Sequence, residues 1–224
     1  MDDVKQVAAP DSPEARKIVL LGGYTADLIE AAEALEIAGT FSGETAKPGS
    51  DIHRFLVAHA VIAYARCFAN SNVREKLDTI VAIPSQHVDV HQAMMDVRNK
   101  TVAHSESTLQ VTYASVDLRH VGEETTVERA VAITFSHPIP RLVIEQLQRL
   151  ITDLRAALQV HFDVAKAELI SSLDGTAASG LWDHGVQPRL VPTSDAEWVA
   201  NARRGKYPAS AETPIYVGWL PDDE

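Results

Sequence analysis

The chain has 224 residues, of which 46% are hydrophobic and 23% charged, and its formal net charge at pH 7 is -11. This composition is ordinary for a globular protein, and the length suffices for one good core with a small appendage. Proteins that bind nucleic acid through their overall surface field are basic, so the charge disfavours extensive nonspecific binding of that kind. The acidic excess lies outside residues 51–104, where basic and acidic residues nearly balance.

Cysteine usage and hydropathy set further bounds. The single cysteine, Cys67, rules out an internal disulfide framework and a cysteine-rich metal site, and we expect it to pack in the core. The acidic N-terminus is followed by no apolar run, so we expect no signal peptide. No stretch approaches the roughly 20 apolar residues of a membrane span. We therefore expect a cytoplasmic protein without membrane contact.

The first half of the chain predicts a series of helices. Ser12 followed by Pro13 favours a helix start, and Gly22-Gly23 should end that helix. Ser50 should cap a strong helix in which apolar residues recur with a helical period. The predicted helices cover residues 14–21, 26–38, 51–69, 73–81 and 85–104, with a loop over 39–49.

The second half begins with β-rich sequence and then returns to helix. Residues 109–116 and 129–135 predict an antiparallel hairpin, at about 109–135, with a polar connection. Residues 141–171 predict a long helix with a nearly unbroken apolar stripe. Beyond residue 174 the sequence predicts an extended tail with a short helix at 195–203 and a strand at 215–220. We expect the aromatic side chains of this tail to dock on the body or on a partner: Trp182, Trp198 and Trp219.

One stretch, Met94 to His104, combines residue types suited to phosphate chemistry. Arg98 and Asn99 are adjacent near the end of a predicted helix, and five residues separate Arg98 from His104. Arginine binds phosphate through a planar, permanently charged fork, and histidine transfers protons near neutral pH. On an ideal helix six residues advance about 9 Å and rotate about 240°, so a long arginine can reach toward a phosphate near His104.

This wording, Arg-Asn followed by His104, resembles the signature of HEPN-domain proteins. The resemblance covers roughly residues 25–171 and implies a mainly α, antiparallel helical bundle, here with an inserted hairpin and an irregular tail. The segments would be an N-terminal one (1–24), the bundle (25–174) and the Pro/Trp-containing tail (175–224). Active members are metal-independent ribonucleases, so the resemblance implies Arg98, Asn99 and His104 as catalytic residues. It also implies a homodimer, RNA as substrate, and a defence or toxin–antitoxin setting with an antitoxin or other protein partner.

Other residues are weaker candidates for RNA or phosphate contacts: Tyr64, Arg66, Arg74 and Lys100. For Arg66, an ion pair with Asp96 or Asp89 is an equally good interpretation. His87 and His91 have a spacing that can hold a metal, but no third ligand is evident, so we expect neither a metal nor another cofactor.

Two further interpretations stay open. A non-catalytic HEPN-like module would bind a nucleotide, RNA or protein partner, and a plain helical interaction protein would recruit a partner through its tail. The net charge favours the non-catalytic module, as does Glu106, which stands where the best-known toxin subgroup carries a tyrosine. The intact Arg98, Asn99 and His104 favour the ribonuclease.

Overall fold

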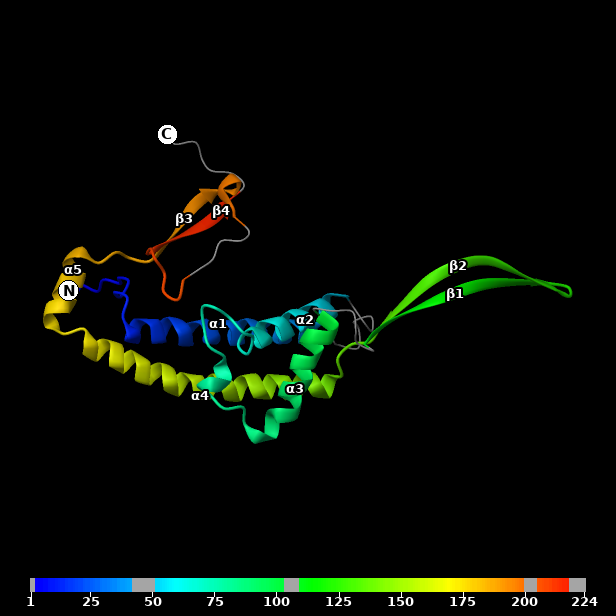
Figure 1. The fold of residues 1–224 in the computed structure, drawn as a ribbon, viewed down its shortest axis with the longest axis horizontal. Coiled ribbons are helices and arrows are strands. Elements are labelled where there is room, and N and C mark those ends of the chain that lie inside the picture. Colours follow the sequence, from blue (N-terminus) through cyan, green and yellow to red (C-terminus); the bar gives the residue numbers. More distant parts are fainter. Residues whose placement is uncertain (1–2, 42–50, 103–108, 200–204, 218–224) are drawn as a thin grey trace. The chain divides into compact units, whose positions relative to one another are not determined.

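The computed structural model describes residues 3–41, 51–102, 109–199 and 205–217. In these residues helices predominate, as expected for a mainly α protein (Figure 1). None of the helices in these ranges is both long and apolar enough to cross a membrane. In chain order the elements are α1 (Pro13–Thr40), α2 (Asp51–Arg66), α3 (Val88–Val97), β1 (Gln110–Val121), β2 (Glu124–Ser136), α4 (Arg141–Ser172), α5 (Gly175–His184), β3 (Arg189–Ser194) and β4 (Glu212–Val217).

The chain divides into two compact units. The first unit comprises Met1–Gly23, Asn70–Glu75 and Leu158–Glu224, and the second comprises Tyr24–Ala69 and Lys76–Ala157. These units do not coincide with the segments 1–24, 25–174 and 175–224, because α1 and α4 each contribute residues to both.

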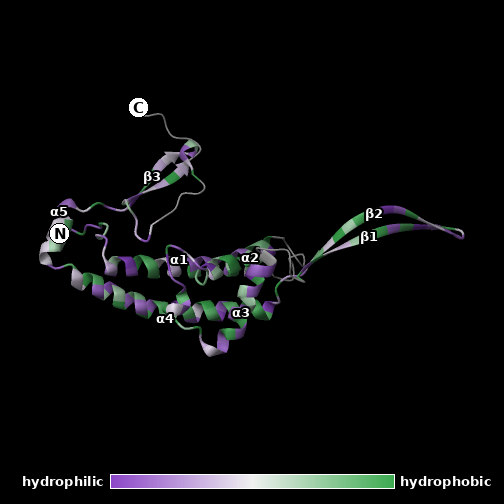
Figure 2. Ribbon diagram, in the orientation of Figure 1, coloured by the Kyte–Doolittle hydropathy of each residue, from purple (hydrophilic) through white to green (hydrophobic). Residues whose placement is uncertain are grey.

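The core of the second unit is helical. Hydrophobic and hydrophilic residues alternate along α4 (Figure 2), and the apolar stripe expected from the sequence is the face that becomes buried. Burying one leucine contributes about 1.5–3 kcal/mol, so such a stripe is a strong determinant of packing. The largest fully buried side chains of this unit are Tyr24, Leu28, Leu35, Tyr64, Leu77, Met94, Leu147, Leu150, Ile151 and Leu154.

Helix α1 differs from the prediction at Gly22-Gly23, which do not end a helix. The chain continues without a break from Pro13 to Thr40, and Ser12 caps it by accepting a hydrogen bond from the Ala15 N–H at 3.0 Å. A glycine in a helix costs about 1 kcal/mol relative to alanine. Burial of Leu21 on one side of the pair and Tyr24 on the other outweighs that cost.

Three shorter predictions in the first half have mixed outcomes. Helix α2 begins at Asp51 as expected and ends at Arg66, while Ser50 and most of the predicted loop lie outside the described residues. The predicted helix over 73–81 is wrong, since that segment contains a 3-10 turn at Leu77–Thr79. The Leu77 N–H donates to the Cys67 carbonyl at 2.8 Å, and Cys67 is buried as expected.

The hairpin is confirmed, and its two strands are longer than predicted because they extend into the expected connection. Strands β1 and β2 pair antiparallel from Gln110↔Ser136 to Val121↔Glu124, and the turn contains Gly122 with a φ of 62°. That positive φ suits glycine, which has no Cβ to clash. Every side chain of the two strands is exposed or half-exposed, including Tyr113 and Phe135, whose rings meet edge to face at 5.9 Å.

The tail is more regular than expected. Asp174 caps α5 by accepting from the Ala177 N–H at 3.0 Å, and β3 pairs in parallel with β4. Two contacts inside the first unit join the N-terminal segment to this region: the Ala8 N–H donates to the Val186 carbonyl at 2.8 Å, and the Tyr207 hydroxyl to the Ala9 carbonyl at 2.6 Å. Of the tryptophans, Trp182 is 49% and Trp198 62% exposed, so each is partly covered within this chain, and Trp219 lies outside the described residues.

We predict that Gly22→Ala stabilises the protein by about 0.5–1 kcal/mol, because it restores helix propensity in the interior of α1. An added Cβ there would lie 4.0 Å from the Phe162 ring, an ordinary contact. Urea unfolding monitored by circular dichroism measures the change. Gly39→Ala, near the helix end with no atom within 4 Å of the added Cβ, should have a smaller effect. Destabilisation by Gly22→Ala would contradict a continuous α1.

Candidate functional site

The motif begins where α3 changes its helical geometry. After Val97 the chain enters a π-helical turn, Arg98–Val102, and the Arg98 N–H is shared between the carbonyls of Met94 and Met95. Short π-helical segments are rare and are often found at functional sites, because the wider turn re-aims the side chains that it carries. Arg98 and Asn99 are the first two residues of this turn.

Asn99 fixes the direction of the Arg98 guanidinium. One terminal nitrogen of Arg98 donates to the Asn99 Oδ1 at 2.9 Å, and Arg98 is half-buried while Asn99 and Lys100 are exposed. A guanidinium has five N–H donors, so one bond to Asn99 orients the group and leaves capacity for a phosphate. His104, the third predicted catalytic residue, lies outside the described residues.

A cavity of about 150 Å³ lies beside the motif and includes Val97, the residue before Arg98. We call it the motif-end cavity. Three separate segments of the second unit converge on it: α2, the end of α3, and the base of the hairpin. The lining residues from α2 and the hairpin base include His53, Arg54, Phe55, Leu109, Ser136 and His137.

The motif-end cavity holds two imidazoles and a guanidinium. His53 and Arg54 are half-buried on α2, and His137 follows β2. The His137 N–H donates to the Leu109 carbonyl at 2.7 Å, which places His137 at the base of the hairpin. The Arg54 guanidinium lies 5.0 Å from the centre of the Phe55 ring. Imidazoles can exchange protons and a guanidinium can bind a phosphate, so the lining suits phosphoester chemistry.

Sequence reasoning did not single out His53, Arg54 or His137. His53 and His137 are far apart in the sequence, and neither stands in a motif. The convergence depends on the strand pairing Gln110↔Ser136, which fixes Leu109 and His137 as neighbours. The predicted hairpin implied that the regions of Leu109 and His137 are neighbours, but it did not imply that α2 lies beside the hairpin base.

Tyr64, a predicted RNA contact, is part of the core. Its side chain is fully buried, and its hydroxyl lies 2.6 Å from the Nδ1 of His91. Burial raises the pKa of Tyr64, which keeps the phenol protonated and able to donate. Burial also lowers the pKa of His91, with a smaller opposing effect of Asp78, and so favours a neutral imidazole that accepts this bond. Tyr64 is thus shielded from RNA in this structure.

Arg66 is engaged by acidic residues of α1. Its Nε lies 2.9 Å from the Asp27 Oδ1, and another of its nitrogens pairs with Glu30, which also contacts the Nε2 of His59 at 2.8 Å. Arg66 therefore forms ion pairs, as one interpretation expected, but its partners are Asp27 and Glu30 and not Asp96 or Asp89. This arrangement ties the end of α2 to α1. Arg74 belongs to the first unit and does not line the motif-end cavity.

The two histidines with a metal-like spacing point to different partners. His87 is buried and its Nε2 lies 2.9 Å from Asp153 on α4, whereas His91 bonds to Tyr64. Among the residues that the structure describes, no group of three or more His, Cys, Asp or Glu side chains is placed to hold a metal ion.

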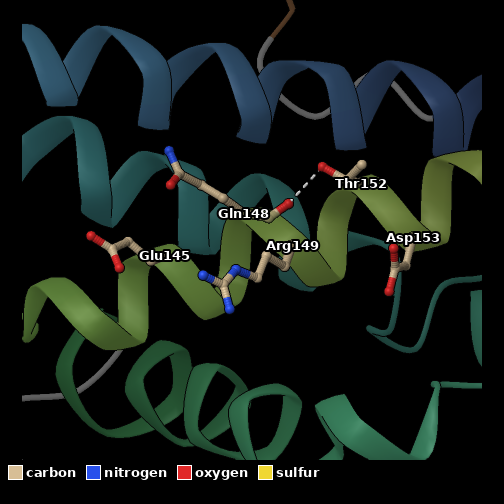
Figure 3. Close-up of a pocket in the computed structure, with 5 residues that line it drawn as sticks. All are labelled: Glu145, Gln148, Arg149, Thr152 and Asp153. Carbon is tan, nitrogen blue, oxygen red and sulfur yellow. Dashed lines mark hydrogen bonds between the residues drawn. The ribbon is translucent and has the colours of Figure 1, made fainter.

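A shallow depression on α4 is a weaker candidate site (Figure 3). It is lined by Glu145, Gln148, Arg149, Thr152 and Asp153, all from one helix. Glu145, Arg149 and Asp153 follow at intervals of four residues, a spacing typical of a solvated helix face with alternating charges. The Thr152 hydroxyl donates to the Gln148 carbonyl at 2.9 Å. We interpret this face as structural.

Comparison with known proteins does not assign the chain to a family. No protein-family model matches the chain, and no curated protein or solved structure matches it either. The interpretation of the site therefore depends on the residues that line it and on the contacts described above.

We predict that the stability of the wild type falls between about pH 7 and pH 5 partly through His91. Its pKa in the folded state lies below the ordinary value of 6.5, so the unfolded chain takes up more protons in this range and is favoured as the pH falls. His91→Gln should remove that part of the pH dependence, whereas His161→Gln, a change at an exposed position of α4, should keep it. Urea unfolding at several pH values measures both. Equal pH dependence in all three proteins would contradict the assignment.

Proposed function

We propose that the protein is a metal-independent HEPN-type endoribonuclease acting in a defence or toxin–antitoxin setting. The observation that carries the proposal is the Arg98–Asn99 hydrogen bond on a π-helical turn, one residue from a cavity that contains two histidines. A phosphate held by Arg98 would have imidazoles within the same part of the molecule.

The chemistry requires a proton acceptor, a proton donor and a cation. In the proposed reaction the 2′-oxygen of a ribose gives up its proton and bonds to the adjacent phosphorus, and the bond from phosphorus to the 5′-oxygen breaks. The departing 5′-oxygen takes up a proton, and a 2′,3′-cyclic phosphate remains. Arg98 stabilises the extra negative charge of the phosphorane, and Asn99 keeps the guanidinium in place. His104 is the proposed proton-transfer residue.

The motif-end cavity offers candidates for the second proton transfer. A single imidazole can serve as base and acid only in turn, whereas two can act on opposite sides of one phosphate. His53 and His137 line the cavity beside the motif, so either is suited to that second role. Arg54 adds a second guanidinium near the same phosphate.

A non-catalytic HEPN-like module that binds a nucleotide, RNA or protein partner is the second candidate. It is favoured by the net charge of -11, by the burial of Tyr64 and by the pairing of Arg66 with acidic residues of α1. In that case Arg98 and Lys100 would bind a phosphate without turnover.

We predict that the purified protein cleaves single-stranded RNA in the presence of EDTA and leaves 2′,3′-cyclic phosphate ends. Arg98→Ala and His104→Ala should each lower the cleavage rate about 10²–10⁴-fold, the range typical of a lost proton-transfer or charge-stabilising group. Arg98→Lys should restore little activity, because an ammonium lacks the fork. Gel analysis of end-labelled RNA, with chemical identification of the termini, measures these effects.

The matched control is Arg155→Ala, which removes an exposed arginine of α4 and should leave the rate unchanged. Circular dichroism of each variant shows whether it is folded. If the wild type cleaves no RNA and both motif variants are strongly destabilised, Arg98 and His104 are structural and the endoribonuclease proposal fails. A folded but inactive protein that binds RNA through Arg98 would support the second candidate.

We further propose a homodimer with the two copies of the motif facing a shared cleft, because two copies would concentrate cations and imidazoles around one phosphate. Light scattering after size-exclusion chromatography at micromolar concentration should give twice the chain mass of 24.4 kDa. A monomer under these conditions would contradict the dimer, and RNA cleavage by that monomer would separate assembly from catalysis.

A further inference from the structure

The first unit contains a cavity of about 550 Å³ that neither the motif nor the proposed function uses. Its walls come from the N-terminal half of α1, from the segment 71–75 and from Lys206 in the tail. The volume falls in the range of about 300–1,000 Å³ that is typical of small-ligand pockets. We call it the first-unit cavity.

The lining of the first-unit cavity is basic in an acidic protein. Four of the lining residues are cations and one, Glu75, is an acid, although the chain as a whole carries a net charge of -11. Such a local excess attracts anions, since charged clefts concentrate the surrounding field. The four cations are Arg16, Lys17, Arg74 and Lys206.

Two of these cations have acidic partners that lie outside the lining. Arg16 forms a two-bond pair with Asp11 at 2.7 and 2.8 Å, and Lys17 contacts Glu168 at 2.8 Å. The Arg16–Asp11 pair lowers the pKa of Asp11 through its hydrogen bond. Exposed ion pairs of this kind are weak, so a multiply charged ligand can replace them at little cost.

The backbone of α1 supports the same ligand chemistry. The helix begins at Pro13, which lines the cavity, so the positive end of its dipole lies on this side. Gly23 also lines the cavity, and a Cβ added there would lie 3.4 Å from an Arg74 guanidinium nitrogen. The Arg74 guanidinium therefore lies close against this part of the helix. The lining also includes the apolar side chains of Val19, Leu20 and Val73.

We propose that the first-unit cavity binds a small ligand that carries two or more phosphate groups. Several cations around one cavity suit adjacent phosphates, because each additional negative group finds another donor. The apolar wall suits an uncharged portion of the same ligand. This inference does not depend on the proposed endoribonuclease, since the cavity belongs to the other compact unit and is lined by none of the catalytic candidates, although it includes Arg74, a predicted RNA or phosphate contact.

Isothermal titration calorimetry of the full chain at low salt, with inorganic tripolyphosphate as probe, tests the proposal. We expect one ligand per chain and an affinity that falls as salt rises. Lys206→Glu should weaken binding by about tenfold or more, because it reverses one charge at an exposed position. Glu75→Gln should strengthen binding, because it removes the acid from the lining. ATP as a second probe distinguishes the source: tighter binding than tripolyphosphate indicates a nucleotide, and equal binding indicates the polyphosphate alone.

The matched control is Lys166→Glu, which makes the same charge change in the same unit at a residue that does not line the cavity. It should leave the affinity within about twofold, and circular dichroism should show all variants folded. The proposal is overturned if tripolyphosphate and ATP both fail to bind at millimolar concentration. It is also overturned if Lys206→Glu and Lys166→Glu weaken binding equally, or if only single-stranded RNA binds with sensitivity to Lys206→Glu. Loss of RNA cleavage with intact tripolyphosphate binding would instead concern the motif alone.

Discussion

The burial of one face of α4 is the constraint on which the rest of the structure depends. Leu147, Leu150, Ile151 and Leu154 are almost completely removed from solvent in the second unit, and Leu158 and Ala165 continue the same face in the first. At about 1.5–3 kcal/mol for each large side chain, this face outweighs any single cap or ion pair. Burial likewise explains why α1 stays helical through Gly22 and Gly23 instead of ending there, since Leu21 and Tyr24 on either side of the pair are buried.

The parts of the fold that could be predicted from sequence are those whose signals are local. The period of α4, the cap at Ser12 and the β-rich composition of the hairpin strands need no knowledge of distant residues. The predicted helix break failed because glycine propensity is a local preference of about 1 kcal/mol, and burial of neighbouring residues is a tertiary effect of larger size. The same limit explains the tail, where β3 and β4 pair in parallel across an intervening segment, a pairing that local sequence patterns do not specify.

In the candidate site, too, local features could be predicted from the sequence and long-range contacts could not. Arg98 and Asn99 are adjacent in the sequence, and their hydrogen bond follows from that adjacency. Arg66 could be recognised as a charge that needs a partner, but its partners Asp27 and Glu30 come from another helix and could not be identified. Likewise, His53 and His137 acquire a shared environment only when the hairpin base closes beside α2. The sequence shows which residue types are present, but it does not show which of them lie close together in the fold.

The overall charge of this protein is negative, but basic side chains gather at two places in it. A net charge of -11 repels polyanions at long range, so it discourages indiscriminate contact with nucleic acid. At physiological ionic strength that field is screened beyond about 8 Å, and local side chains then decide what binds. The motif turn carries Arg98 and Lys100, and the first-unit cavity gathers four cations. In the proposed roles, an anion that fits either place would be held by short-range, directional donors, while a polymer without that fit would meet a surface with an excess of acidic residues. Local basic clusters within an acidic chain therefore favour selective binding of phosphates over binding by bulk charge.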